Sequence, residues 1–298
     1  MGKRACLRCT KLKRACHMPL HWNTRLDERK QLLDLKMMCK SFKLAVHKNS
    51  FLGELGVLVM GYAVIFDNLC LLELALEGGV DVDGEIRISD TWRRIEPTPL
   101  FCAISSNNLK IVQALLRAGA STSARNIYSD TPLLYATTQN RLEIVTALLD
   151  ANVDVNAVSN CGGTAIHHAE EPKLLRLLVG AGANPNIVEL PWKRGPLHAA
   201  TRKAKFSQVL ALLEVGANPN AQDEAGITPL HEAIHDYFPA ERHQRIKIIK
   251  ALLAYGANRF IKDHLGFTAL DRANRIRFSD AAAILASDDC DFHGNPSS

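Results

Sequence analysis

The chain has 298 residues, of which 47% are hydrophobic, a length and composition that allow a sizeable buried core and exclude a wholly disordered protein. No apolar run reaches the roughly 18 to 20 residues of a membrane-spanning helix, and no secretory signal follows the basic N-terminus, so we expect no membrane association. The eight cysteines are mostly scattered singly, which predicts reduced thiols in a nuclear or cytosolic protein.

The formal net charge of +5 is divided unequally along the chain. Residues 1–48 hold 13 Lys or Arg and 3 Asp or Glu, a net charge of +10, whereas the remaining 250 residues hold 23 and 28, a net charge of −5. A basic arm on a mildly acidic body predicts different partners for the two parts. The alternative is that the arm is only a solvated basic leader.

Residues 1–23 form this basic arm. Cys6, Cys9 and Cys16 have the spacing C-x2-C-x6-C with Lys and Arg between them, which resembles the first half of the fungal binuclear zinc cluster, a DNA-binding family. The resemblance implies six cysteines around two zinc ions, but the next cysteines are Cys39 and Cys70, so a complete cluster is excluded. A decayed and disordered zinc module, a one-zinc variant with a histidine as fourth ligand, and a chance pattern stay open. The charge would support nuclear import or weak, sequence-independent nucleic-acid contact.

Residues 24–57 are predicted to form a helical capping segment that packs on the first repeat unit, because their apolar residues follow a rough helical stripe. Leu33 to Phe42 faintly resembles the second half of an F-box, a module that recruits ubiquitin ligases. The Leu-Pro opening of that module is absent here. Docking of other machinery by this segment is therefore the less favoured interpretation.

One pattern then recurs at intervals close to 33 residues. Its starts are Thr98-Pro99-Leu100, Thr131-Pro132-Leu133, Thr164-Ala165-Ile166, Gly195-Pro196-Leu197, Thr228-Pro229-Leu230 and Thr268-Ala269-Leu270. Each start precedes a short, alanine-containing helix and a second helix with a Leu-Leu doublet or its equivalent. Thr suits a helix N-cap and Pro the first helical position. Glycines such as Gly216 and Gly256 follow the second helix, where a left-handed residue is needed to end it.

The motifs Thr228-Pro229-Leu230-His231-Glu232-Ala233 and Gly216-Ala217-Asn218-Pro219-Asn220 resemble the signature of the ankyrin-repeat family. The resemblance covers residues 58–290 and implies an all-α solenoid of about seven helix-pair units, with finger turns beside a concave groove. Unit starts are expected near 58, 98, 131, 164, 195, 228 and 268. The first and last units are atypical, as capping repeats are. Residues 291–298 are expected to be a flexible tail.

The connections between helices differ in length from the regular repeat at three places, and we expect a partner to bind there. The unit from Thr164 is about three residues short between its helices, the unit from Thr228 is about seven longer there, and the connection from Gly79 to Thr98 is also about seven longer. Insertions in repeat proteins usually lie on one face, often the binding face, and Trp, Tyr and Arg dominate binding hot spots. The predicted partner-binding residues lie in finger turns: Trp92, Arg93, Arg94, Tyr128, Trp192, Lys193 and Arg194. The alternative is that each Trp packs back onto its own finger.

No pattern of an enzyme active site is recognised in the sequence, and we expect no catalytic residue and no cofactor. His167, His198 and His231 occupy the fourth position of the Thr-Pro-Leu-His motif, where the family resemblance implies a structural role. The adjacent His167 and His168 cannot converge on one metal ion. Beyond Cys6, Cys9 and Cys16 we therefore expect no metal ligand.

Two functions follow from these observations. The first is a non-catalytic regulatory adaptor or transcription coregulator, monomeric and nuclear, that binds a partner protein such as a transcription factor through the groove and fingers. The second is a cytoplasmic scaffold or substrate receptor in ubiquitin-dependent turnover, with residues 24–57 docking the machinery. The identity of the partner does not follow from the sequence, because the surface residues of a repeat fold specify it.

Overall fold

A computed structural model describes residues 53–86, 98–160, 162–234 and 241–287 and divides them into two compact units, one ending at Ile127 and one beginning at Tyr128. Within these residues lie 14 helices in seven consecutive pairs, and an isolated two-residue β-bridge instead of β-strands. The predicted all-α array of about seven helix-pair units is thereby confirmed. Residues 1–23, 24–52 and 291–298, for which we predicted an arm, most of a capping segment and a tail, lie outside the described residues.

The first unit contains two helix pairs. They are α3 (Gly53–Ile65) with α4 (Leu69–Glu77), and α5 (Pro99–Ser105) with α6 (Leu109–Arg117). Helix α3 packs on α4 and α5, and α4 packs on α6. The second helix of each pair begins where Asn68 or Asn108 accepts a hydrogen bond from a backbone N–H three residues on, at 3.0 and 3.1 Å. The core of the unit includes Met60, Leu71, Leu72, Leu100, Phe101, Ile104, Ile111 and Leu115.

The start of the first repeat differs from the prediction. The predicted boundary between the capping segment and the first unit lies between residues 57 and 58, but α3 crosses it as one continuous helix of 13 residues. Apolar residues run from Val57 to Ile65 with no proline and no Thr-Pro start among them, so nothing ends one helix or begins another at residue 58. The first helix of this pair is therefore longer than α5, which has seven residues.

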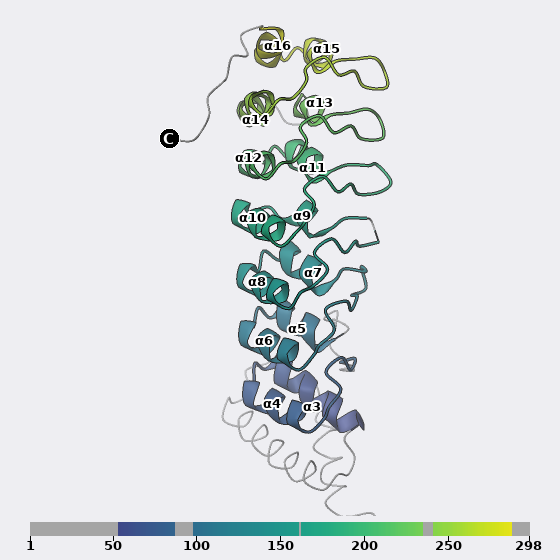
Figure 1. The fold of residues 1–298 in the computed structure, drawn as a ribbon, viewed down its shortest axis with the longest axis vertical. Coiled ribbons are helices and arrows are strands. Elements are labelled where there is room, and N and C mark those ends of the chain that lie inside the picture. Colours follow the sequence, from purple (N-terminus) through teal and green to yellow (C-terminus); the bar gives the residue numbers. More distant parts are fainter. Residues whose placement is uncertain (1–52, 87–97, 161, 235–240, 288–298) are drawn as a thin grey trace, which may run out of the picture. The chain divides into compact units, whose positions relative to one another are not determined.

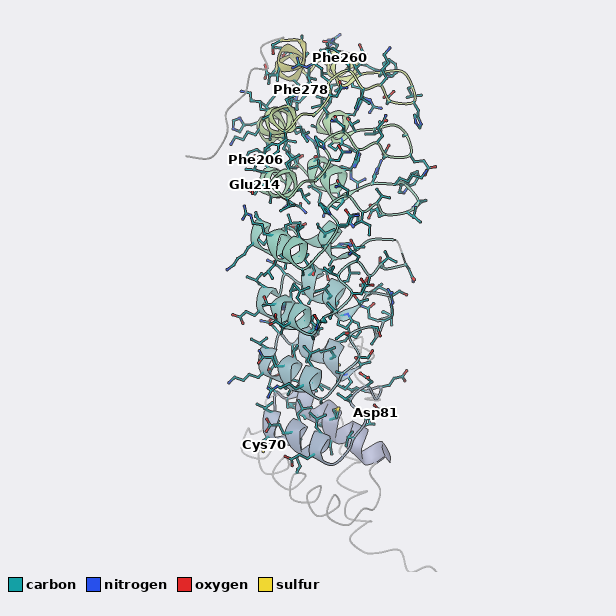
Figure 2. The ribbon with its side chains drawn as sticks, in the orientation of Figure 1. Cys70, Asp81, Phe206, Glu214, Phe260 and Phe278 are labelled. Carbon is teal, nitrogen blue, oxygen red and sulfur yellow. The ribbon has the colours of Figure 1, made fainter. Side chains whose placement is uncertain are left out.

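The second unit contains five helix pairs. They are α7 (Pro132–Thr138) with α8 (Leu142–Asp150), α9 (Ala165–His168) with α10 (Pro172–Gly180), α11 (Pro196–Arg202) with α12 (Phe206–Glu214), α13 (Pro229–Ala233) with α14 (Arg242–Ala254), and α15 (Ala269–Arg275) with α16 (Ser279–Ala286). The first helices of the pairs form one layer and the second helices the other, and finger turns project beside the layer of first helices (Figure 1). Figure 2 marks the two ends of one outer helix, α12, by Phe206 and Glu214.

The repeated motifs begin and end the helices as predicted. The Thr131, Thr228 and Thr268 hydroxyls accept hydrogen bonds from the backbone N–H three residues on, at 3.3, 3.4 and 3.2 Å. Gly216 and Gly256 follow α12 and α14 with φ angles of +87° and +84°, the left-handed region in which a glycine ends a helix without strain. The sequence period is therefore the period of the helix pairs.

Asparagine side chains connect consecutive helix pairs of the second unit along one edge, which we call the asparagine ladder (Asn156, Asn186 and Asn220). Each amide donates to a glycine carbonyl of the next pair, at 2.9 to 3.2 Å. Each amide oxygen accepts from a backbone N–H of the next pair, at 2.6 to 3.0 Å. Because both functions of each side chain are used, the ladder fixes the spacing between neighbouring pairs.

Beside each of the two irregular connections in this unit, one buried polar side chain donates hydrogen bonds to backbone carbonyls. Helix α9 has only four residues, and buried Gln208 of α12 donates to the Ala169 carbonyl at 2.8 Å, where that helix stops. In the first turn of α14, which has 13 residues, the guanidinium of Arg245 is buried and donates to the carbonyls of Glu232 and Arg202, both at 3.2 Å. Arg245 also pairs with Glu241 at 3.1 Å. Such bonds satisfy backbone carbonyls that irregular helices leave without partners.

Candidate functional site

Four of the seven predicted partner-binding residues are described: Tyr128, Trp192, Lys193 and Arg194. Trp92, Arg93 and Arg94 lie in 87–97, outside the described residues, as do the metal candidates Cys6, Cys9 and Cys16. All four described residues of the predicted site belong to the second unit. There the fingers between consecutive helix pairs hold the predicted side chains.

The finger of residues 189–194 presents two large apolar side chains to solvent. Its base is closed by a hydrogen bond from the Glu189 N–H to the Arg194 carbonyl, at 2.9 Å. Trp192 and Leu190 at its tip are both 61% exposed. Lys193 beside them is exposed and has a left-handed φ angle of +52°. Trp192 thus leaves most of its surface to solvent, and its role in partner binding stays a prediction.

Backbone hydrogen bonds join the tips of three successive fingers. The Glu224 N–H donates to the Trp192 carbonyl, and the His264 N–H donates to the Ala225 carbonyl, both at 3.0 Å. The fingers of residues 189–194, 223–226 and 263–266 therefore form one connected row, which we call the finger edge. Leu265 at the tip of the third finger is 75% exposed. The edge presents apolar side chains on a backbone that is already ordered, which lowers the entropic cost of binding.

Tyr128 lies on a different finger, the one that leads into α7, and its side chain is 51% exposed. The finger before α9 lies between it and the finger of Trp192 along the chain. The structure thus places Tyr128 and Trp192 on fingers of the same unit without bringing them into one cluster. Their joint role in binding stays a prediction.

Arg194 is held differently from its neighbours Trp192 and Lys193. Its guanidinium pairs with the buried carboxylate of Asp223 at 3.1 Å and lies 3.7 Å from that of Glu232. Only 24% of the arginine side chain is exposed. Arg194 therefore has a structural role that the sequence analysis did not assign, and contact with a partner stays a prediction for this residue.

The motif histidines connect neighbouring helix pairs. A ring nitrogen of His198 lies 3.0 Å from the Ile227 carbonyl, and one of His231 lies 3.1 Å from the Phe267 carbonyl. Burial lowers the pKa of both rings below 6.5, so both are neutral at neutral pH. Burial also lowers the pKa of His167 and His168. The structural role implied for the motif histidines is confirmed for His198 and His231.

Two pockets open beside the first helices of the second unit. A polar one of about 180 Å³ lies at the short connection after α9 and is lined by Thr137, Thr138, Asn140, His168, Glu170, Glu171 and Lys203. A larger one of about 360 Å³ is lined by His231, Ile234, Leu265, Phe267, Arg272, Arg275 and Ile276. The sequence analysis named none of these residues as partner-binding. Leu190 and Leu265 could have been found by comparing fingertip positions between repeats, because hydrophobic residues rarely stand in turns without a reason.

Charge is polarised along the second unit. Residues 128–234 hold 8 Lys or Arg and 11 Asp or Glu, whereas residues 241–287 hold 9 and 4, so the net charges are −3 and +5. The stretch from α14 to α16 therefore carries a net positive charge although the body of the chain is acidic. Complementary charge raises association rates and selects among partners.

Within the described residues, no group of three or more His, Cys, Asp or Glu side chains is placed to hold a metal ion. Among the described helices there is also none whose length and hydropathy would allow it to cross a membrane.

Comparison with protein families identifies the repeat. A family model described as ankyrin repeats (3 copies) matches residues 60–159 and 197–295. Over 182 residues the chain is 32% identical to putative ankyrin repeat protein L371 of Acanthamoeba polyphaga mimivirus, covering 60% of this chain and 24% of that protein. Over 57 residues it is 44% identical to neurogenic locus notch homolog protein 4 of Homo sapiens, covering 19% and 3%. The chain thus spans a quarter or less of the length of these relatives.

Among solved structures, the fold is similar to the ankyrin repeat domain of Bcl-3, a unique member of the IkappaB protein family. The TM-score is 0.66 at 28% sequence identity, and the match covers 77% of this chain and 98% of that chain. The helix pairs and fingers described above therefore follow a known architecture, one that serves as a non-catalytic interaction module.

Proposed function

This chain belongs to the ankyrin-repeat family, and we propose that it is a non-catalytic regulatory adaptor that binds a partner protein through the finger edge and the groove beside it. We favour a transcription factor as the partner and a monomeric state for the adaptor. The proposal includes the absence of any catalytic role. It rests on the fold and on the exposed apolar side chains of the second unit.

The observation that carries the proposal is the exposure of Trp192. A tryptophan buries a large area at a low entropic cost, which is why it is enriched in binding hot spots. Here its backbone is fixed by the hydrogen bond from Glu224, while 61% of the residue surface faces solvent. Contact with a partner would bury the part of this side chain that faces solvent.

The nuclear location is supported by the N-terminal arm. Its net charge of +10 over residues 1–48 suits nuclear import, and its cysteine spacing resembles half of a zinc module of transcription factors. Weak contact of this arm with nucleic acid is part of the proposal. The alternative is a cytoplasmic scaffold or substrate receptor in ubiquitin-dependent turnover, for which the F-box-like residues 33–42 are the support.

Partner capture with a matched pair of variants tests the adaptor function. Trp192→Ala removes the exposed side chain at a fingertip, and Phe260→Ala removes a side chain that is 75% exposed but lies before the fingertip turn of residues 263–266 (Figure 2). We expect a partner recovered with the wild-type chain and the Phe260 variant to be reduced at least about tenfold with Trp192→Ala, at an unchanged melting temperature. Equal recovery with all three chains, or a large loss of stability in Trp192→Ala, would contradict the proposal.

Localisation of a tagged full-length chain separates the two candidate functions. The regulatory adaptor should accumulate in the nucleus, and replacing the arginines and lysines of residues 3–14 by glutamine should abolish that accumulation. Exclusion of the unaltered chain from the nucleus would favour the cytoplasmic alternative.

A further inference from the structure

The larger pocket of the second unit has the size and walls of a site for one bulky apolar side chain. His231 and Ile234 of the α13 region are both buried and form one side, Leu265 and Phe267 of the last finger form the second, and Ile276 at the end of α15 lies on the third. Its volume of about 360 Å³ lies at the lower end of the range of ligand pockets. The apolar part of an occupant is therefore small, a single side chain with its neighbouring backbone.

The walls of this pocket are ordered before anything binds. The Asp263 carboxylate accepts hydrogen bonds from the Leu265 and Phe267 N–H groups, at 2.9 and 3.0 Å. His231 holds the Phe267 carbonyl, and the His264 N–H binds the neighbouring finger. Leu265 is nevertheless 75% exposed. A rigid backbone that carries an exposed leucine at a pocket mouth costs little further entropy on binding.

The rim of the pocket carries one guanidinium that no carboxylate of the described residues holds. Arg275 lies over the Phe267 ring, 5.7 Å from its centroid, and has no ion pair among the described residues. Two aspartates of the same finger and helix have other partners: Asp263 pairs with Arg272, and Asp271 accepts hydrogen bonds from Thr268 at 2.9 and 2.7 Å. A carboxylate that approaches the rim would therefore meet an arginine free to bind it.

The charge around the pocket favours the same kind of occupant. Residues 241–287, which include α15 and its finger, have a net charge of +5. Burial keeps His231 neutral at neutral pH, since its pKa is lowered. Basic segments are disfavoured on such a surface and acidic segments are attracted to it.

We propose that this pocket binds an extended acidic segment of the partner protein that inserts one bulky apolar side chain beside Leu265 and places a carboxylate against Arg275. The inference rests on the proposed adaptor function and specifies the chemistry of the partner. It assigns recognition to the last two helix pairs, whereas the predicted hot spot around Trp192 lies two fingers away from the finger of Leu265.

Selection from a phage-displayed library of random 12-residue peptides on the full-length chain tests the proposal. We expect the enriched peptides to carry Phe, Leu, Ile, Met or Trp within two positions of Asp or Glu. Their affinity is then measured by fluorescence anisotropy with two matched pairs of variants. Leu265→Ser is paired with Phe260→Ser, because both residues are 75% exposed and Phe260 does not line the pocket. Arg275→Glu is paired with Lys247→Glu, which changes the net charge equally on the exposed surface of α14.

Leu265→Ser and Arg275→Glu should each weaken binding at least about tenfold, and the two controls less than about twofold. Added salt should weaken binding to the wild-type chain because the arginine is exposed. Peptides that are basic, peptides that bind all four variants alike, or the absence of any enriched peptide would overturn the proposal. Peptides lost only in Trp192→Ala would also overturn it while leaving the adaptor function standing. If partner capture itself does not respond to Trp192→Ala, the adaptor proposal fails independently of the peptide result.

Discussion

In two fingers of the second unit an aspartate accepts the same backbone hydrogen bonds, but the arginine that pairs with it comes from a different part of the chain in each. Asp223 accepts from the Ala225 and Ile227 N–H groups, at 2.8 and 3.0 Å, just as Asp263 accepts from those of Leu265 and Phe267. Asp263 pairs with Arg272 of its own helix α15, at 2.8 Å. Asp223 pairs with Arg194, which belongs to the preceding finger.

The difference follows from one position of the repeat. Arg272 stands four residues after Thr268, and the corresponding residue after Thr228 is Glu232, which is buried and negatively charged. The finger of Asp223 and the helix α13 that follows it thus contain two buried carboxylates and no Lys or Arg. Arg194 lies within reach of both, so the order of one finger depends on the finger before it. The backbone of the repeats is regular, but the arginine that pairs with the finger aspartate comes from the same repeat in one case and from the preceding repeat in the other.

Removing the shared arginine should have the largest effect. Arg194→Met leaves Asp223 and Glu232 buried without a cation, and breaking such a buried pair costs about 3–5 kcal/mol. Arg272→Met leaves only Asp263, whose backbone hydrogen bonds remain, so we expect a loss of about 1–3 kcal/mol. Urea unfolding followed by circular dichroism measures both. Equal losses would show that Glu232 does not contribute to the difference.

A second substitution should restore most of the stability lost in the first variant. In Arg194→Met combined with Glu232→Arg, the new arginine stands where Arg272 stands in the next repeat and can pair with Asp223 as Arg272 pairs with Asp263. We expect the double variant to regain at least about 2 kcal/mol in the same unfolding assay, because one buried carboxylate is removed and the other is paired. A double variant no more stable than Arg194→Met would mean that the two fingers are not interchangeable.

Acid should weaken both fingers in the same pH window. His198 and His231 each bind a finger carbonyl, and burial lowers the pKa of both below 6.5. As the pH falls below about 6.5, the unfolded chain binds protons before the folded chain, so stability is complete above that pH and declines below it. The decline should reach up to about 1.4 kcal/mol per pH unit for each histidine. Urea midpoints at about pH 7.5 and about pH 5.5 test this, with His198→Gln expected to flatten the profile relative to the wild-type chain.

The aspartate of the last finger titrates in a separate window. Burial alone would raise the pKa of Asp263, but the Phe267 N–H and the Arg272 guanidinium lower it below 3.8. Its stabilising contribution is therefore present above about pH 3.8 and is lost only as the pH falls further. A loss of stability between about pH 6.5 and about pH 5 thus belongs to the histidines.

The smallest effects are expected at the fingertips themselves. Trp192→Ala and Leu265→Ser remove exposed side chains while the backbone bonds that join the fingers remain. Each should change the free energy of unfolding by no more than about 0.5 kcal/mol. A loss above about 1.5 kcal/mol in either variant would show that the side chain packs within the unit and would remove it from the binding surface.

Most of the fold could be predicted because each repeat contains residues that mark where its helices begin and end. Thr131, Thr228 and Thr268 begin helices, and Gly216 and Gly256 follow helix ends, at the positions that the period indicated. The start of the first unit was not predictable in the same way. Its apolar residues contain no Thr-Pro signal, so no local motif marks where α3 begins.

Less of the candidate site could be predicted, because neighbouring side chains of one finger have different structural roles. Trp192 and Arg194 were grouped by residue type and position, yet one is exposed and the other is paired with buried carboxylates. Which of them is engaged depends on Asp223 and Glu232, 29 and more residues away in sequence. The pocket beside Leu265 was missed for the same reason, since its walls come from two helix pairs and no single segment shows them.

The asparagine ladder has a consequence for protein engineering. Its hydrogen bonds bridge sequence separations from 26 to 38 residues while their lengths stay between 2.6 and 3.2 Å. Differences in length between repeats therefore lie in other parts of the repeat. The ladder forms the same contact between helix pairs whatever the length of the repeat, and so serves as a constant joint between them. Helix pairs could be exchanged or added at such a joint as long as the incoming module supplies the glycine carbonyl and the N–H that the asparagine needs. At the position that corresponds to Asn220, the pair of α13 and α14 carries Phe260, so a graft there would first have to replace that phenylalanine by asparagine.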